Sequence, residues 1–447
     1  TALYHTYLSP TVYMDANGNY RGLDQNIHKA EGFTNYTTFS LWDTYRALHP
    51  LFTILQQRRT SDMVNSMLAH YDQSVHDMLP VWSHHANENW CMIGYHSVPV
   101  IADAIVKKIE GFDYTRALEA SVTTARNGWY DGLDDYMKLG YVPDERTGSS
   151  VSVTLEYAYD DWCIAQAVSK LSEGQPVIKL KETDRGLLKS PGGSHSDQYS
   201  NDLHLEFIDR SQNYLNVWDP STGFMRPRKS DGTFRQEFDV LSTHGQGFIE
   251  GNAWNYSLYV PHDPDALIRL HGGKKRFTEH LDSLFTMYLP DSFFAETEDI
   301  TREGIIGNYV HGNEPSHHVP YLYNHAGAPR KAQYWVRQIM DTKYLPSPDG
   351  LSGNDDCGQM SAWYIFSALG FYPVAPAADR YDLGSPLVRD ATLRLENGKT
   401  FTVTAVNQGQ QNIYVKKAEL NGKKLDRLYI THDEIMHGGR LVFYMGR

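Results

Sequence analysis

Cysteine is scarce in this sequence, because only Cys91, Cys163 and Cys357 occur among 447 residues. They are too few and too scattered to form a disulfide framework, and they lack the CxxC or CxH spacing of a zinc site. The cysteines therefore point to no cross-linked scaffold and leave the redox compartment open.

Positive charge is also limited, since 41 Lys and Arg stand against 54 Asp and Glu and give a formal net charge of −13. Nucleic-acid binding needs clustered Lys and Arg, so the composition predicts no nucleic-acid partner and favours a neutral or cationic ligand. The chain contains no run of about 18 apolar residues, which predicts that it has no membrane span.

Targeting and catalytic signatures are absent as well. The first residues, TALYHTYLSP, form neither the charged n-region nor the apolar h-region of a signal peptide. Thr1 falls inside a helical or strand-like run that is already under way, so we expect a preceding segment that this chain does not include. The sequence also lacks a GxSxG elbow, a P-loop, a Rossmann fingerprint and the HEXXH pattern of zincins.

Aromatic residues are abundant, with 30 Tyr, 9 Trp and 17 Phe. Aromatic faces stack on the CH faces of sugar rings, so this composition suits a carbohydrate-binding protein. A large core packed with aromatic side chains explains the same composition, because aromatics dominate core burial in general. Composition alone leaves both explanations open.

Hydrophobic periodicity is mostly helical from about residue 35 to 372. Apolar stripes with spacing i, i+3, i+4 and i+7 occur at 98–109, 159–171 and 360–368, and a glycine follows each of them. Long Gly-, Asn- and Pro-rich loops separate the stripes, and loops of that length are usually functional. This pattern suggests an α/α toroid, and other large helical folds fit the same pattern. The stretch 175–203 breaks the rhythm, and we interpret it as a surface insertion or extended loop.

The pattern changes after about residue 386. Two alternating runs are joined by Asn397-Gly398, and Asn421-Gly422 marks a second tight turn before the strand-like run LVFYM. We therefore expect a small antiparallel β domain at the C-terminus, with a boundary near 376–388.

Two segments hold candidate catalytic carboxylates. Glu250 lies between apolar rings in GFIEGNAW, a setting that raises a carboxyl pKa and suits a general acid, although a capping role for the same residue is equally compatible. Asp355 and Asp356 lie in SGNDDCGQ, directly before an amphipathic helix whose N-terminus favours an ionised base. Asn354 or Asp355 is also a candidate N-cap.

A third segment, GNEPSHH, groups Asn313 and Glu314 with two histidines. Adjacent histidines rarely ligate one ion, and no further soft ligand has zinc spacing. Asn and Glu oxygens suit calcium better, but the segment is not an EF-hand, and a capped helix start explains it equally well.

An aromatic ring, a carboxylate and a guanidinium occur together in FSLWDTYR, through Trp42, Asp43 and Arg46. This combination holds a sugar by stacking and paired hydrogen bonds, and a buried Asp–Arg pair is the structural alternative. Trp90 and His96, in NWCMIGYHSVP, form a weaker case of the same kind.

Five long segments follow one another along the chain: FSLWDTYRALHPL, MIGYHSVPVIADA, EGNAWNYSLYVPHD, GNEPSHHVPYLYNHAGAP and GNDDCGQMSAWYIFSALGFYPV. Together they resemble glycoside hydrolase family 92, over essentially the whole chain. The resemblance implies a calcium-dependent exo-α-mannosidase that inverts the anomeric centre and acts on mannose-containing oligosaccharides such as N-glycans and mannans. It further implies a periplasmic or secreted location, from the substrate class.

The resemblance also implies an architecture. We expect an (α/α)6 barrel over residues 1–378 and a C-terminal antiparallel β domain over 379–447. An N-terminal β-sandwich, which this chain does not include, would precede the barrel and pack on it.

The resemblance assigns roles to the residues already singled out. It implies Glu250 as general acid and Asp356 as base. The two residues lie on separate loops, as expected if their carboxyl groups are roughly 6.5–9.5 Å apart, the separation found in inverting enzymes. Some relatives carry a carboxylate where this chain has Asn354, so a part for Asp355 beside the base stays open. Asn252 of the acid segment is a further candidate for binding the substrate.

The remaining implied roles concern the sugar and the ion. Trp42 and Asp43 match the segment that lines the terminal mannose site, and Asn313 and Glu314 match the calcium segment. Two alternatives remain: a metal-independent (α/α)6 glucosidase, and a sugar-binding fragment without catalytic activity.

Overall fold

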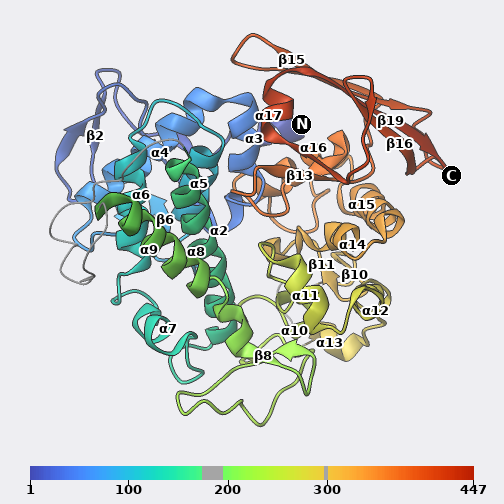
Figure 1. Ribbon diagram of the computed structural model, residues 1–447, viewed down its shortest axis with the longest axis horizontal. Helices are drawn as coiled ribbons and strands as arrows, with labels where there is room; N and C mark the ends of the chain where they lie inside the picture. Colours follow the sequence, from blue (N-terminus) through green and yellow to red (C-terminus); the bar gives the residue numbers. More distant parts are fainter. Residues whose placement is uncertain (174–194, 296–300) are drawn as a thin grey trace.

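The computed structural model describes residues 1–173, 195–295 and 301–447. Its first part, up to about residue 370, is mainly helical, and its last part is mainly β (Figure 1). No helix among the described residues is both long and apolar enough to cross a membrane. The expected order of a helical domain followed by a β region is therefore confirmed.

The helices vary from single turns to more than six turns. The α-helices are α1 (Ala2–His5), α2 (Leu41–Thr44), α3 (Leu48–Leu55), α4 (Gln57–Gln73), α5 (Ser97–Val106), α6 (Tyr114–Ala125), α7 (Leu133–Leu139), α8 (Ser150–Ser172), α9 (His195–Arg210), α10 (Ala253–Tyr256), α11 (Pro264–Leu270), α12 (Lys274–Thr286), α13 (Asp291–Ala295), α14 (Leu322–His325), α15 (Pro329–Lys343), α16 (Gln359–Leu369) and α17 (His432–Met436). The 3₁₀ turns are η2 (Asn213–Val217), η3 (Glu314–Ser316) and η4 (Val319–Tyr321).

Short strand pairs decorate the helical part. They are β1 (Thr11–Val12) with β4 (Tyr36–Thr37), β2 (Asn19–Arg21) with β3 (Ile27–Lys29), β5 (Phe39–Ser40) with β6 (Trp82–His84) and β7 (Asn87–Glu88), β8 (Trp218–Asp219) with β9 (Phe224–Met225), and β10 (Ile305–Ile306) with β11 (Tyr309–Val310).

The helices predicted from the apolar stripes are confirmed as α5, α8 and α16. Helix α16 ends at Gly370, whose φ of 91° is left-handed and suits a glycine C-cap. Helix α8 begins at Ser150, nine residues before the predicted stripe, and lies in the middle of the helices α5, α6 and α9 that contact it (Figure 1).

The predicted loop at 175–203 falls largely outside the described residues. From His195 onward the prediction is wrong, because α9 begins there and packs against α8. Leu203 and Phe207, one helical turn apart, are both fully buried. The Ser-, Asp- and Asn-rich start of α9 conceals this short apolar stripe in the sequence.

The C-terminal part forms two sheets. One has the order β12 (Phe371–Tyr372), β13 (Arg380–Leu383), β18 (Tyr429–Thr431), and the other has the order β14 (Asp390–Arg394), β15 (Thr400–Val406), β19 (Gly439–Gly446), β16 (Tyr414–Leu420), β17 (Lys423–Lys424). The β14–β15 and β16–β17 hairpins turn at Asn397-Gly398 and Asn421-Gly422, as predicted.

The expectation of a purely antiparallel domain is wrong in one pairing. Strand β19 runs parallel to β15 and antiparallel to β16, so the five-stranded sheet is mixed. Strands β17 and β19 are both antiparallel to β16, and the connection between them passes through β18 and α17, so β19 enters the sheet in the direction of β15.

One hydrophobic core runs through both parts of the molecule. The contacts include Tyr159 of α8, whose hydroxyl donates to the Pro376 carbonyl at 2.8 Å, and Asn324 of α14, whose amide donates to the Leu383 carbonyl at 2.8 Å. Strand β12 pairs with β13 across the expected boundary at 378/379. The N-terminus and α1 lie beside α16 and the C-terminal sheets (Figure 1).

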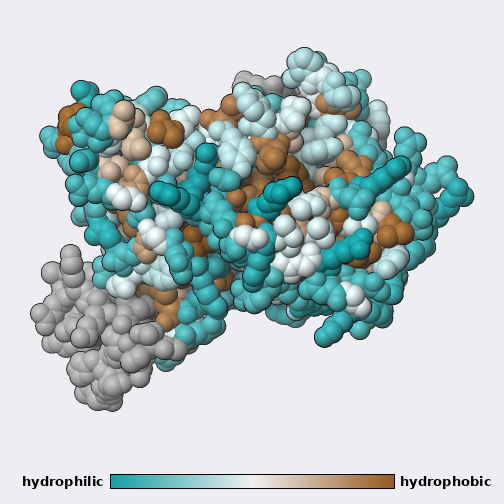
Figure 2. All heavy atoms as spheres, turned by 90° about the horizontal axis from the view of Figure 1, so that it is seen from above, coloured by the Kyte–Doolittle hydropathy of each residue, from teal (hydrophilic) through white to brown (hydrophobic). Residues whose placement is uncertain are grey.

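Hydrophilic residues cover most of the face in Figure 2, and apolar residues gather in a recess between two raised parts.

Candidate active site

A cavity of about 670 Å³ brings together loops from distant parts of the chain. This volume lies within the usual range for small-ligand sites, roughly 300–1,000 Å³. Six residues predicted from the sequence line it: Trp42, Asp43, Glu250, Asn313, Glu314 and Asp356.

The short helix α2 supplies the first pair, Trp42 and Asp43. Ser40 precedes the helix, its hydroxyl donates to the Asp43 carboxylate, and its carbonyl accepts from the Thr44 hydroxyl at 2.8 Å. Trp42 and Asp43 are each only 2% exposed. The α2 turn therefore presents an indole and a carboxylate to the cavity, and Ser40 holds the carboxylate.

Glu250 is anchored through the backbone that precedes it. The Gly247 carbonyl accepts from the first N–H groups of α8, Val151 at 2.9 Å and Ser152 at 3.1 Å, and the Ile249 N–H donates to the Ser152 hydroxyl at 3.1 Å. Gly247 has a φ of 86°, and a Cβ there would lie 2.6 Å from Pro227. Glycine is therefore required where this segment crosses α8.

Asp355 and Asp356 are neighbours with different surroundings. The Asp355 carboxylate accepts from the Ser361 N–H in the first turn of α16 at 2.9 Å. The N-cap position itself is Gly358, so the prediction of Asn354 or Asp355 as the N-cap is wrong, although Asp355 does bind the first turn of the helix. Burial raises the pKa of Asp355. Asp356 lines the cavity instead. One acid therefore fixes the helix end and the other faces the ligand space.

Glu250 and Asp356 share an unusual backbone conformation. Their φ angles are 52° and 46°, in the left-handed region that residues with a Cβ rarely adopt. Such conformations cost about 1–3 kcal/mol each and occur preferentially at functional sites. Both predicted catalytic acids are thus held in orientations that the surrounding loops impose.

Two glycines explain how the GNEPSHH segment reaches the SGNDDCGQ segment. A Cβ on Gly312 would lie 2.2 Å from the Ser352 carbonyl oxygen, and the ideal Cβ of Gly353 would lie 3.3 Å from the Gly312 Cα. The two loops therefore touch backbone to backbone. This contact places Asn313 and Glu314 beside Asp356.

Asn313 connects the acid to a group of oxygen atoms. Its amide nitrogen donates to the Glu250 carboxylate at 3.2 Å, which directs its Oδ1 elsewhere. That Oδ1 and the Glu314 Oε1 are buried and have no hydrogen-bond partner among the described residues. Carboxylate oxygens of Asp43, Glu314 and Asp356 all lie within 4.8 Å of one another.

This oxygen-rich arrangement fits a hard divalent cation. Calcium is bound by carboxylate and amide oxygens, and the donors here are of that kind. Burial, and next the charge of Asp356, raise the pKa of Asp43 to about 8. Burial also raises the pKa of Glu314 well above its usual value, with Asp43 and Asp356 adding to the effect. A cation among these acids would favour their charged forms.

Four predicted site residues do not line the cavity. Besides Asp355, His96 is buried between two carboxylates of α8, and Asn252 caps α10 through the Trp254 and Asn255 N–H groups. Trp90 packs against Trp129 and His76. The structure therefore gives Asn252 and His96 structural partners and packs Trp90 among other aromatic rings.

Sequence reasoning missed two features of the site. It did not group Asp43 and Asp356 with Glu314 as oxygen donors, because they belong to three distant segments. It also missed the other cavity residues, which include Trp82, Cys91, Met92, Thr243, His244 and Thr301. Cys91 and Met92 directly follow Trp90, a predicted site residue, and this adjacency was the available signal for them.

A helical domain whose loops gather carboxylates in one cavity has the arrangement of a helical glycoside-hydrolase domain. The chain belongs to glycosyl hydrolase family 92, because the model of the family's catalytic domain matches residues 1–447. The resemblance noted in the sequence is thereby confirmed.

Solved structures of the same family are similar to this chain along its whole length. The GH92 α-mannosidase BT3965 from Bacteroides thetaiotaomicron is 48% identical, with a TM-score of 0.88, and the match covers 100% of this chain and 54% of that one. BT3965 has also been solved in complex with mannoimidazole, with a TM-score of 0.90 and 56% of that chain covered. The inverting mannosidase BT2199 from the same bacterium is 35% identical, with a TM-score of 0.83, over 99% of this chain and 58% of that one.

A curated relative from the fungus Arthroderma benhamiae is described as an uncharacterized secreted glycosidase. It is 29% identical over 383 residues, which cover 79% of this chain and 45% of that protein. The chain thus spans about half the length of the relatives that it matches.

Proposed function

We propose that this chain is the catalytic domain of an exo-α-mannosidase that releases terminal α-linked mannose from N-glycans or mannans. The observation that carries the proposal is the cavity in which Glu250, Asp356 and the oxygen donors of the GNEP segment meet. The similarity to α-mannosidases at 35% and 48% identity supports the same substrate class. The proposal extends to an (α/α)6 arrangement of the helices and to a periplasmic or secreted location.

In the proposed reaction Glu250 donates a proton to the leaving oxygen, and Asp356 takes a proton from the attacking water. The two acids lie on different loops that line one cavity, and Asn313 orients the Glu250 carboxylate. Single displacement with inversion requires room for a water molecule between the base and the sugar. Trp42 offers an aromatic surface for the sugar ring. Together these residues provide acid, base and stacking surface.

Asn313 and Glu314 would hold a calcium ion, with Asp43 beside them. When bound, the ion supplies positive charge that attracts sugar hydroxyls. Asp356 lies close enough to the other acids to serve as a ligand too. We assign it the role of the base because it lies just before the N-terminus of helix α16.

Proton NMR of α-mannoside hydrolysis by the complete protein tests the proposal, because it reports the linkage cleaved and the anomer released together. We expect β-mannose as the first product, with activity lost in EGTA and restored by calcium. Release of α-mannose would exclude inversion, and full activity after metal removal would exclude calcium.

The alternatives give different results in the same assay. A metal-independent glucosidase would hydrolyse an α-glucoside in EGTA. A sugar-binding fragment would bind mannosides without releasing any product.

A further inference from the structure

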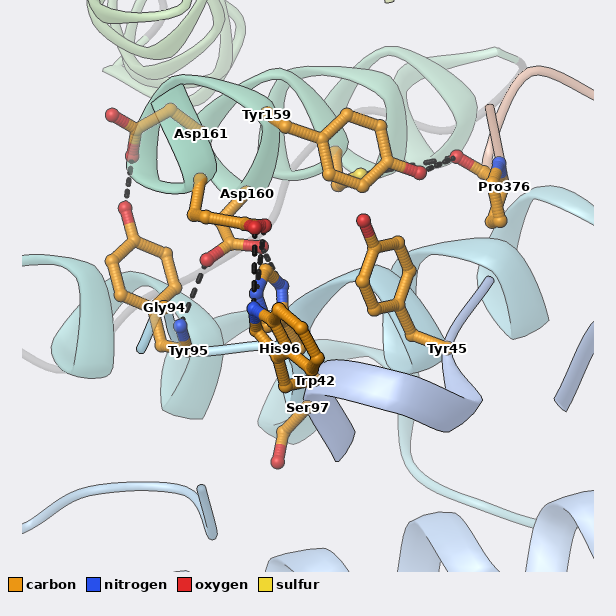
Figure 3. A network of polar contacts seen from close by, with 12 residues as sticks. Trp42, Tyr45, Gly94, Tyr95, His96, Ser97, Tyr159, Asp160, Asp161 and Pro376 are labelled. Atoms are coloured by element: carbon orange, nitrogen blue, oxygen red, sulfur yellow. Dashed lines mark hydrogen bonds and ion pairs between the residues drawn. The ribbon is translucent and has the colours of Figure 1, made fainter. Parts of the chain in front are cut away.

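A buried cluster of charges lies behind the cavity wall, on the face of α8 that points toward α2 and α5 (Figure 3). Glu156 and Asp160 are one helical turn apart on α8, and both are fully buried. His96 lies between them, with its Nε2 3.0 Å from a Glu156 oxygen and its Nδ1 2.7 Å from an Asp160 oxygen. Figure 3 shows the His96 ring directed toward this helix.

The cluster balances its own charges. Arg46, which is 5% exposed, places a guanidinium nitrogen 3.5 Å from Glu156 and is surrounded by the rings of Trp42, Tyr45 and Tyr259. Burial alone would lower the pKa of His96, but the carboxylates of Asp160 and Glu156 raise it to about 9.

Two carboxylates and two cations therefore occupy one buried site. A buried ion pair is weak evidence for net stability, because desolvation offsets much of the attraction between its charges. Stability alone therefore does not explain why four charged groups are buried here, and a role in the neighbouring site is a second explanation.

Glu156 connects this cluster to the cavity through Trp42. The Trp42 indole N–H donates to Glu156 Oε1 at 3.2 Å, and the same oxygen accepts from the Tyr256 hydroxyl at 3.1 Å. The Arg46 Nε donates to the Trp42 carbonyl at 2.9 Å. Both ends of Trp42, the indole and the main chain, are therefore tied to the same buried carboxylate, directly or through Arg46.

The position of Trp42 affects more than one group of the site. Trp42 lines the cavity, and Asp43, the next residue, belongs to the oxygen cluster. The α2 helix that carries them has only four residues, so its own hydrogen bonds constrain it little. The contacts to Glu156 and Arg46 supply the missing constraint.

We propose that Glu156 is a positioning residue that sets the plane of the Trp42 ring against the bound sugar, and that Arg46, His96 and Asp160 hold Glu156 ionised for this purpose. The proposal rests on the proposed function in that the sugar is a mannoside. Glu156 acts through Trp42 and does not touch the reacting atoms.

The test is a double-mutant cycle in the complete protein, with Glu156→Gln and Trp42→Phe. Glu156→Gln keeps the shape of the side chain and removes its charge, and Trp42→Phe removes the indole N–H and keeps an aromatic ring. We expect each change to raise KM for an aryl α-mannoside and to lower kcat/KM by about tenfold to hundredfold, as misplaced binding groups do. The double variant should be no worse than the worse single variant, because both changes break one contact. Additive losses would overturn the proposal.

Asp161→Asn is the matched control. Asp161 is the residue after Asp160 on the same helix, is equally buried, and bonds to the Tyr95 and Tyr136 hydroxyls and to Arg210, none of which lines the cavity. We expect this variant to be less stable with KM unchanged. A KM shift as large as that of Glu156→Gln would mean that any loss of buried charge on α8 disturbs the site, and the specific role of Glu156 would be refuted.

A second measurement needs no turnover. The chain has nine Trp residues, and the Trp42 indole N–H signal in an NMR spectrum is the one that Trp42→Phe removes. Glu156→Gln should shift this signal and Asp161→Asn should not. An unmoved signal would overturn the positioning role even if the enzyme hydrolyses mannosides, whereas a shifted signal in a protein without mannosidase activity would refute only the proposed function.

Discussion

Two clusters of acids, mostly buried, lie close together in this molecule and differ in how their charge is balanced. On α8, Glu156 and Asp160 contact the cations His96 and Arg46 directly. In the cavity, Asp43, Glu314 and Asp356 approach one another, and no Lys or Arg is among the residues that line it in the described part of the chain.

This difference in charge balance distinguishes acids that support the structure from acids that are available to a ligand. Acids that meet buried cations are already satisfied and serve to fix the structure. Acids that meet one another store repulsion, which a proton or a metal ion relieves. The second cluster is therefore where a ligand of positive charge is expected, and the same substitution should have opposite effects in the two places.

Asp356→Asn should have the largest effect on activity. Removal of a general base costs about 10²–10⁴-fold in rate, and we expect a loss of this order on every substrate. In EGTA the variant should also melt at a higher temperature than the wild type, because one of three repelling acids is gone. Initial rates and thermal melts measure both. Appreciable residual activity would move the base to Asp355.

The matched change at a cation-paired acid of α8 is Asp161→Asn. Asp161 pairs with Arg210 and lies outside the cluster of Glu156 and Asp160. The substitution leaves Arg210 with a weakened partner, and we expect a lower melting temperature with kcat/KM unchanged. The contrast between cation-paired acids and mutually repelling acids fails if both Asp→Asn variants shift the melting temperature in the same direction.

Glu250→Gln should cause the second-largest loss of activity, and the size of this loss should depend on the leaving group. A glycan needs a protonated leaving oxygen, so we expect a loss of about 10²–10⁴-fold on mannobiose. An aryl mannoside with an acidic phenol needs less assistance and should lose much less. Kinetics on the two substrates compare them, and equal losses would remove Glu250 from the acid role.

Gly312→Ala should reduce activity by about tenfold to hundredfold, because its methyl group would meet the Ser352 carbonyl and separate the two loops. Gly148→Ala is the matched control, since a Cβ at Gly148 meets no atom within 4 Å. Steady-state kinetics of both variants should show a loss only for Gly312→Ala. Comparable activity in the two variants would show that the loop contact is not needed.

Calcium should raise the melting temperature of the wild type, an effect smaller than the catalytic losses. A ligand at 100 times its Kd stabilises by about 2.7 kcal/mol. Glu314→Gln should reduce the shift, and Asp161→Asn should retain it in full. Melts in EGTA and in excess calcium measure this, and an undiminished shift in Glu314→Gln would place the ion elsewhere.

The sequence predicted the local features of the fold well. Apolar stripes followed by glycine became α5, α8 and α16, and both Asn-Gly turns became hairpins. It missed α9 after His195, where polar residues open the helix, and the parallel entry of β19. Strand direction depends on a crossover that local patterns do not encode.

The site was predicted only in part, because local sequence patterns identify segments but do not show how distant segments meet. Residues such as Glu250 and Asp356, which belong to recognisable segments, line the cavity together. His96 and Asn252 are polar residues in those segments that serve as buried partners, and a motif does not show which way its side chains point. The oxygen cluster arises from three distant segments, so only the tertiary structure reveals it.

The backbone contact between Gly312 and the Ser352–Gly353 turn has a consequence for engineering. Because the two loops touch backbone to backbone, no side-chain substitution can tune the distance between the proposed ion ligands and the proposed base. Variation of substrate range must therefore come from the rim, where Cys91, Met92, His244 and Thr301 border the same cavity. A library restricted to these positions would explore new glycans while leaving the chemical centre of the domain intact.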